Sequence, residues 1–452
     1  MAVESIVNLS KLEGSTRLDA EFYRPIYLKI RQKILKKPYV KMGGIVETCR
    51  KGIFDIKAEK YTSSGIPFVR ISNLRNGLIN DDDMAFIPPE IHRKEINTEL
   101  NKLDLVLSKT AYPAASLIFY DKCNISQDII GISLNKYWKD KMIAPYIVAF
   151  LNTKYGIAEM QQWFQGNIQM HLALPDVRRI LIPIIPLNVQ KNISKTFFMA
   201  HEQMECSKSV YRQAEKLLLE ETGLDEFKLN FKLSYSCDLS KAFNFHRVDA
   251  EYFQPAFDKL INKIKDYQNG CVKLLKFVEG VKKDFDPARY PDKIFSYVEL
   301  ADIDAAIGLI RRKSKIRGEE APSRARRLLK KNDVIVSSVE GSLAKVALVD
   351  DEHDACLAST GFFQFRPTKI LPEVLLVLSK SIVLQAQLKK ECSGTILTAV
   401  PNESVKRILI PILPDKTQKR IASLVQKSHE ARKKAKELLE EAKRKVEQAI
   451  ES

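Results

Sequence analysis

The chain has 452 residues, 45% of them hydrophobic and 29% charged, which is an ordinary globular mixture long enough for two or more domains. Its 73 Lys and Arg outnumber 56 Asp and Glu and give a net charge of +17, which favours a polyanionic partner such as nucleic acid over a merely basic surface. The seven cysteines are scattered and never spaced C-x-x-C, which excludes a disulfide framework and a zinc knuckle.

The chain carries the same series of motifs twice. R-L-D-A-E-F-Y-R-P at residues 17–25 returns as R-V-D-A-E-Y-F-Q-P at 247–255, an offset of 230 (247 − 17). R-I-L-I-P-I-I-P at residues 179–186 returns as R-I-L-I-P-I-L-P at 407–414, an offset of 228 (407 − 179). A register that holds through a whole half indicates a tandem duplication.

Between these anchors, residues 26–165 and 256–393 share a pattern but little identity. Both contain short β-branched and apolar runs bounded by Gly, Asp, Asn and Pro, such as residues 66–71 and 294–300. Such runs are typical of strands and turns. Each half therefore contains one variable, strand-rich domain of roughly 150 residues, a normal domain size.

Each half ends in a long predicted helix of about 30 residues, or on the order of 45–50 Å at 1.5 Å per residue. Apolar or small residues alternate at spacings of four and three, which is typical of a heptad seam. The first seam comprises Ile193, Phe197, Ala200, Met204, Ser207, Tyr211, Ala214 and Leu218. The second comprises Ile421, Val425, Ser428, Arg432, Ala435, Leu439, Ala442 and Val446, with Arg432 the only poor fit.

Two equal helices bury their seams best against each other, and duplicated halves are commonly related by a pseudo-twofold axis. The alternative is that each helix packs only onto its own domain. We therefore predict an α+β fold in which two tandem, pseudo-twofold-related strand-rich domains are separated by a long antiparallel two-helix coiled-coil spacer. The predicted parts are a first domain with its N-terminal anchor (1–186), a central helix (187–224), a linker and second domain (225–414) and a C-terminal helix (415–452).

The repeated anchors resemble the specificity subunit of type I restriction–modification enzymes. The resemblance includes the R-x-D-A-E opening, the I-P-F-V-R-I-S-N-L strand at 66–74, the I-P-x-x-P-x-x-x-Q-K-x-I helix entry and the duplication itself. It implies two target recognition domains that each read half of a bipartite, asymmetric DNA site. It also implies that the helices set the gap and bind two methyltransferase subunits, and that a translocating restriction subunit joins them. One departure is Ser108–Lys109–Thr110, where many members have Gly-Thr.

No catalytic motif supports chemistry in this chain. There is no Asp/Asn-Pro-Pro-Tyr/Phe loop, no G-x-G-x-x-G loop after a strand, no phosphate loop and no H-E-x-x-H pair. We therefore predict a non-catalytic subunit without cofactor or metal. No membrane helix or secretory leader is recognisable, so we expect a cytoplasmic protein with no membrane partner. Two alternatives stay open: a self-contained enzyme, and a coiled-coil nucleic-acid adaptor without sequence specificity.

Candidate DNA contacts are basic, amide and hydroxyl side chains in loops, because these side chains bind phosphates and match base edges. In the first domain they follow the strand after Pro67 and the strand ending at Ser108, and they occupy the polar loop at 165–171. In the second domain they form the basic clusters after residues 310 and 322 and the loop after Ser337. The predicted contacts are Arg70, Asn73, Arg75, Lys109, Tyr112, Gln165, Asn167, Gln169, Arg311, Arg312, Lys313, Arg324, Arg326, Arg327, Ser338 and Lys345.

Overall fold

The computed structural model describes residues 4–8, 17–75, 77–110, 112–139, 141–166, 170–394 and 398–452. The chain forms two compact units. Unit 1 comprises Met1–Met204 and Lys433–Ser452, and unit 2 comprises Glu205–Arg432. Unit 1 is therefore built from two separate stretches of chain. Among the described residues, none of the helices has the length and apolarity needed to cross a membrane.

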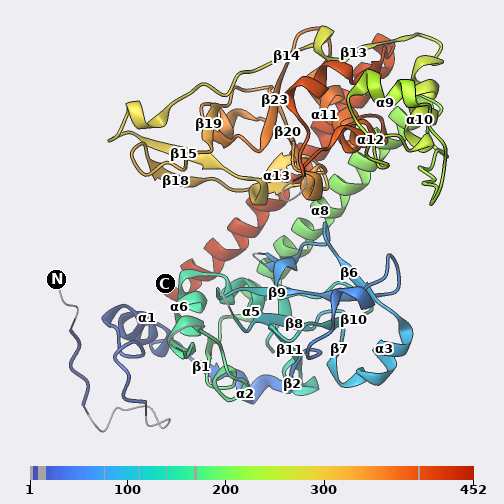
Figure 1. The fold of residues 1–452 in the computed structure, drawn as a ribbon. Helices are drawn as coiled ribbons and strands as arrows, with labels where there is room; N and C mark the ends of the chain where they lie inside the picture. The colour runs from blue at the N-terminus through green and yellow to red at the C-terminus, as the bar shows by residue number, and fades with distance from the viewer. Residues whose placement is uncertain are drawn as a thin grey trace. The chain divides into compact units, whose positions relative to one another are not determined.

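Unit 1 contains two main sheets (Figure 1). The four-stranded sheet has the order β6 (Ala85–Ile87), β3 (Ile66–Val69), β10 (Lys122–Ile125), β7 (Glu99–Asn101). The six-stranded sheet has the order β2 (Val46–Lys51), β11 (Ile129–Leu134), β8 (Leu105–Ser108), β9 (Ala115–Leu117), β5 (Gly77–Ile79), β4 (Leu74–Arg75). Strand β1 (Tyr39–Lys41) pairs separately with β12 (Leu181–Pro183). The pairs β3–β10 and β5–β9 are parallel, whereas the others are antiparallel.

Helices fill the remainder of unit 1. They are α1 (Pro25–Leu35), α2 (Met42–Ile45), α3 (Pro89–Lys94), α4 (Lys136–Lys139), α5 (Ala144–Leu151), α6 (Lys154–Trp163), α7 (Leu174–Val177), and parts of α8 (Leu187–Glu221) and α13 (Asp415–Glu451). Proline begins α1 and α3, where its missing N–H is not needed. Seven of the eight residues of α5 are buried, so this helix forms part of the core and not of the surface.

Unit 2 repeats the four-stranded sheet and the first four strands of the six-stranded sheet. One has the order β18 (Ser314–Arg317), β15 (Ile294–Val298), β22 (Leu357–Ser359), β19 (Ala325–Leu328). The other has the order β14 (Val278–Gly280), β23 (Phe362–Pro367), β20 (Val334–Ser337), β21 (Val346–Leu348). Two further pairs are β16 (Ile303–Asp304) with β17 (Leu309–Ile310), and β13 (Cys271–Lys273) with β24 (Leu409–Pro411). Its own helices are α9 (Leu239–Phe245), α10 (Pro255–Lys265), α11 (Pro372–Lys380) and α12 (Ile382–Glu391).

The repeat extends to strand pairing and to the backbone conformation of single residues. The parallel pair β3–β10 of unit 1 corresponds to the parallel pair β15–β22 of unit 2. Leu103 and Asn332, which lie 229 positions apart (332 − 103), both adopt a positive φ, of 72° and 70°. The next residue in each unit, Asp104 or Asp333, accepts a hydrogen bond from a backbone N–H three residues earlier. The mixture of helices and strands predicted from the sequence is confirmed, and the duplicated motifs fold into matching elements.

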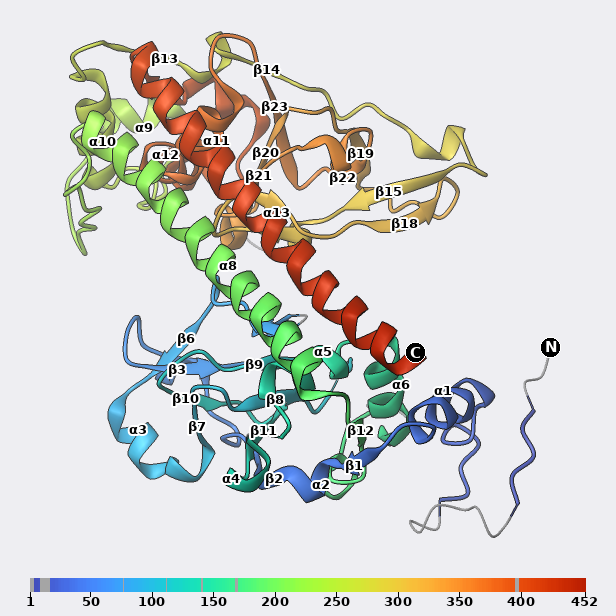
Figure 2. The ribbon, with the colours of Figure 1, turned by 180° about the vertical axis from the view of Figure 1, so that it is seen from behind.

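The predicted heptad seams are buried except at Met204 and Arg432, which are partly exposed. In unit 1, Ile193 and Phe197 of α8 share a core with Leu439 and Val446 of α13. In unit 2, Tyr211, Ala214 and Leu218 share a core with Ile421 and Val425. The hydroxyls of Ser207 and Ser428 lie 3.2 Å apart, and Thr417 donates to Glu221 over 2.9 Å, so the two segments run antiparallel in unit 2. Figure 2 shows the segments side by side within each unit. The helices thus pack against each other as well as onto the sheets.

Candidate nucleic-acid interface

A tight turn, Ile71–Asn73, precedes the β4–β5 hairpin in unit 1, and Asn73 is its last residue. The Asn73 side chain accepts from the Arg70 backbone N–H (2.9 Å) and donates to the Asn80 carbonyl (2.8 Å). The residue is only 1% exposed. In unit 2, the carboxylate of Asp302 accepts from the Glu299 N–H at the equivalent place (2.9 Å). Asn73, which we predicted to contact DNA, is therefore a turn-forming residue, and its burial leaves its amide no access to bases.

Arg70 and Arg75 flank this turn. The Arg70 guanidinium lies 2.9 Å from a carboxylate oxygen of Asp83 and 5.7 Å from the ring centroid of Tyr61. Arg75 donates to the hydroxyl of Tyr112 over 2.8 Å. Tyr112 is 42% exposed. The structure therefore brings together two predicted contacts, Arg75 from the hairpin and Tyr112 from the loop after β8.

The loop after β8 is joined to the segment around Gln165. The Leu172 N–H donates to the Lys109 carbonyl (2.8 Å), and Gln165 and His171 pair through their backbones. The Gln165 amide donates to Asp176 over 2.7 Å, a carboxyl whose pKa is raised chiefly by burial. Lys109 and Gln165 thus belong to one cluster of loops. The predicted contacts Asn167 and Gln169 lie outside the described residues.

Unit 2 joins the same two loops. The Val400 N–H donates to the Ser338 carbonyl (2.8 Å), and Val339 forms a bridge with Ala399. The Ser338 hydroxyl donates to the Gly361 carbonyl (3.0 Å). The predicted loop equivalence of Lys109 and Ser338, which lie 229 positions apart (338 − 109), is therefore matched by the backbone.

A basic group follows the β16–β17 hairpin of unit 2. Arg311 and Lys345 both donate to the Ile303 carbonyl, each over 3.3 Å. The Arg312 side chain is 65% exposed and lies 3.6 Å from Asp302. Lys313 is exposed and donates to the Glu352 carbonyl. Four predicted contacts from two parts of the sequence, Arg311, Arg312, Lys313 and Lys345, thus surround one hairpin.

Three further arginines lie in β19 or directly before it. Arg324 is exposed, and Arg326 forms an ion pair with Asp286 at 2.6 Å. Arg327 is only 4% exposed and donates to the Val281 carbonyl over 2.8 Å. Burial lowers the pKa of Arg327 to about 10. We therefore assign Arg327 a structural role, whereas Arg324 and Arg326 lie at or near the surface.

Sequence reasoning missed an aromatic feature shared by both units. Tyr290 is 51% exposed, and the Lys293 ammonium lies 5.8 Å from its ring centroid. Tyr61 occupies the corresponding place in unit 1, 229 positions earlier (290 − 61), with Arg70 over its ring. An aromatic ring beside a cation suits contact with both base faces and phosphates. The signal was available, because tyrosine recurs at the repeat offset.

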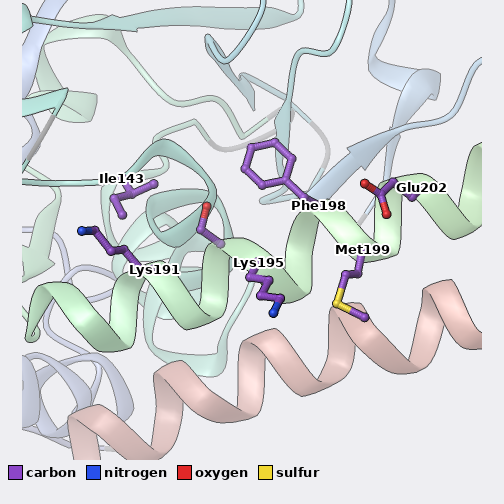
Figure 3. Close-up of a pocket in the computed structure, with 7 residues that line it drawn as sticks. Ile143, Lys191, Lys195, Phe198, Met199 and Glu202 are labelled. Carbon is purple, nitrogen blue, oxygen red and sulfur yellow. The ribbon is translucent and has the colours of Figure 1, made fainter.

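A shallow groove runs along α8 in unit 1 (Figure 3). Its lining combines apolar and charged side chains: Ile143, Lys191, Ser194, Lys195, Phe198, Met199 and Glu202. Such a mixture suits a protein segment better than a small ligand. Within the described ranges, no group of three or more His, Cys, Asp or Glu residues is arranged to hold a metal ion.

Parts of the chain are similar to known proteins in sequence or in structure. Two solved structures align over nearly the whole chain. One is the S subunit of a type I restriction-modification system from M. genitalium (13% identity, 90% of this chain and 95% of that chain, TM-score 0.41). The other is the HsdS subunit from Thermoanaerobacter tengcongensis (14% identity, 91% and 96%, TM-score 0.29). No curated protein matches the chain. Residues 36–215 match the family model described as type I restriction modification DNA specificity domain, so this part of the chain is similar to that domain.

Proposed function

We propose that the chain is the non-catalytic subunit that reads a bipartite, asymmetric DNA target, with one half-site read by each unit. The observation that carries this proposal is the repetition of one strand order around different surface side chains. The hairpin that follows the parallel strand carries Arg75 in unit 1, whereas in unit 2 it leads into Arg311 and Arg312. Two units with the same strand order but different surface side chains suit a target whose two halves differ in sequence.

The target recognition domains are residues 1–186 and 225–414 in this proposal, and the helices are residues 187–224 and 415–452. The candidate readers are Arg70, Arg75, Lys109, Tyr112 and Gln165 in unit 1, with Asn167 and Gln169 in the same loop. In unit 2 they are Arg311, Arg312, Lys313, Arg324, Arg326, Ser338 and Lys345. Arginine can donate two hydrogen bonds to guanine in the major groove, whereas lysine contacts with phosphates add affinity without sequence preference.

The proposed partners are duplex DNA, two methyltransferase subunits and the restriction subunits that complete the assembly. Helices α8 and α13 set the gap between the half-sites and carry the methyltransferase. Support for docking comes from the groove on α8, where Met199 is 39% exposed beside Lys191 and Lys195. An exposed apolar side chain with charged neighbours is typical of a protein interface.

The test is to co-express the chain with its methyltransferase subunit and to sequence the host DNA for N6-methyladenine. We expect a split motif, with a few fixed bases on each side of an unspecified gap. The methyltransferase expressed alone is the control and leaves that motif unmethylated. An undivided motif, or the same methylation without the chain, contradicts the proposal. DNA binding that ignores sequence would instead favour the coiled-coil adaptor.

A further inference from the structure

Arg432 is the charged exception in the heptad seam of α13. Its side chain is only 13% exposed, and its guanidinium lies 3.0 Å from the carboxylate of Asp304, which is 5% exposed. A charge so far removed from water is tolerated only with a close partner, so the two residues depend on each other. At this position of the seam, α13 therefore contacts the β16–β17 hairpin through an ion pair.

A second side chain from the same turn of α13 holds the other side of that hairpin. His429 donates from Nε2 to the Ile307 carbonyl over 2.8 Å. The hairpin is closed between these two points, because the Gly308 N–H donates to the Asp304 carbonyl (2.9 Å). Burial lowers the pKa of His429, which keeps the imidazole neutral at pH 7. Arg432 and His429, from one turn of α13, thus both bind the tip of the β16–β17 hairpin.

The same hairpin orients the basic group. The Arg311 N–H donates to the Asp302 carbonyl (2.8 Å), and the Arg311 and Lys345 side chains both donate to Ile303, the residue before Asp304. A shift of Asp304 would therefore move the backbone to which these cations are bound. Base recognition tolerates errors of only about 0.5 Å, so the hairpin needs a rigid support.

Unit 1 has an uncharged residue at the helix position that corresponds to Arg432. Met204 occupies the position of Arg432, 228 residues earlier (432 − 204), and Arg75 that of Asp304, 229 residues earlier (304 − 75). A Cβ added at Gly77 would lie 2.8 Å from the ring of Phe197 and 3.7 Å from Leu439. Apolar contact with the helices therefore supports the hairpin in unit 1, and the Asp304–Arg432 pair belongs to unit 2 alone.

We infer that Arg432, assisted by His429, is a positioning residue for DNA reading by unit 2: it fastens the β16–β17 hairpin to α13 and so fixes Arg311, Arg312 and Lys345. The inference rests on the proposed function. It predicts an effect confined to one half-site, because Arg75 and Met204 stand at the corresponding positions of unit 1 and cannot form such an ion pair.

The experiment compares three variants of the full chain, each co-expressed with the methyltransferase: Arg432→Met, Arg432→Lys and Lys265→Met. Arg432→Met introduces the residue that unit 1 has at this position. Lys265→Met removes an exposed charge from α10, away from the proposed DNA and methyltransferase contacts, and serves as the matched control. Methylation is measured at sites that carry a single mismatch in either half. Arg432→Met should lower discrimination in one half-site by about tenfold, comparable to the loss of one good base contact.

The affected half-site should be the one that Arg312→Ala also alters, with the other half-site and the control unchanged. Equal loss in both half-sites, or a pattern identical to Lys265→Met, overturns the inference. If Arg432→Met does not fold, Arg432→Lys decides, since a retained charge with altered donor geometry should still weaken the same half-site selectively. Failure of the unaltered chain to give a split motif overturns the proposed function itself, and the inference with it.

Discussion

Units 1 and 2 have the same side-chain caps at turns and helix ends but differ in the polar contacts that join their helices. The turn before the hairpin is capped by Asn73 in one unit and Asp302 in the other, and a helix begins at Thr153 or Ser381 in the same way. By contrast, Arg31 of α1 forms a buried ion pair with Glu159 of α6 in unit 1 (2.7 Å). Backbone geometry is thus retained where a turn or helix end requires it, whereas a buried side-chain pair is one of several ways to join two helices.

Unit 2 has no charged residue at either of these two positions, although Lys390 of α12 lies 2.9 Å from the half-exposed Asp258 of α10. Ile261 replaces Arg31 and Gln387 replaces Glu159. Both side chains nevertheless accept a backbone hydrogen bond. A carboxylate oxygen of Glu159 accepts from the Leu181 N–H (3.0 Å), and the amide oxygen of Gln387 accepts from the Leu409 N–H (2.9 Å). The essential role of this position is therefore to accept a backbone hydrogen bond, and the ion pair is an addition in unit 1.

The largest expected effect comes from Glu159→Gln, which gives unit 1 the residue of unit 2. The amide keeps the bond to Leu181 but removes the negative charge beside Arg31, so we expect a loss of about 3–5 kcal/mol in the free energy of unfolding. The double variant Arg31→Ile/Glu159→Gln should recover most of that loss. Denaturant unfolding combined with hydrogen exchange assigns the change to unit 1. Equal stability of the single and double variants would contradict the comparison.

A smaller effect is expected from removing one arginine that is proposed to contact bases in each unit. Arg75→Ala should relax base choice in one half-site, and Arg312→Ala should relax it in the other, each by about 1–3 kcal/mol if the arginine contacts a base. Arg93→Ala removes an exposed charge on α3 and is the control. Sequencing of methylated sites gives the discrimination at each base. If both reader variants alter the same half-site, the assignment of one half-site to each unit is wrong.

The smallest expected effect concerns pH and His429. Because burial lowers its pKa below the usual value of about 6.5, the unfolded chain takes up the proton more readily than the folded one. The stability that the neutral imidazole provides is therefore complete when the pH is above the usual histidine pKa. It declines as the pH falls from there toward the lower pKa of the folded state. In His429→Gln this component is absent, so the variant and the unaltered chain should converge in unfolding free energy between pH 7.5 and 5.5. A constant difference would exclude the buried imidazole as the cause.

The sequence was most informative where a period or an offset repeats. The four-three spacing identified the buried faces of α8 and α13, and the offset of 228–230 identified the duplication. It was least informative about β3 and β10, whose parallel pairing joins short strands more than fifty residues apart. Strands of three or four residues contain too little periodicity to predict their neighbours. The pairing therefore could not be derived from local pattern.

Two site predictions failed for local reasons. An asparagine such as Asn73 can bond a base or close a turn, and only comparison with Asp302 distinguishes these roles. In Ala325–Leu328, two adjacent arginines give no sign of which one faces inward, and the backbone turns Arg327 into the protein and leaves Arg326 partly exposed. Chemical type alone predicted the kind of contact, whereas access depended on the fold.

The composition of unit 1 from two stretches of chain has a consequence for synthesis on the ribosome. Its core includes Leu439, Val446 and Ile450, and Lys154 bonds to Glu451, 297 positions later. Unit 2 consists of residues 205–432 and needs none of those last residues. The part of the protein that is translated first is therefore completed last. Until α13 emerges, the apolar side chains that it covers in unit 1 stay exposed, and the nascent chain depends on prompt elongation or on chaperones during that interval.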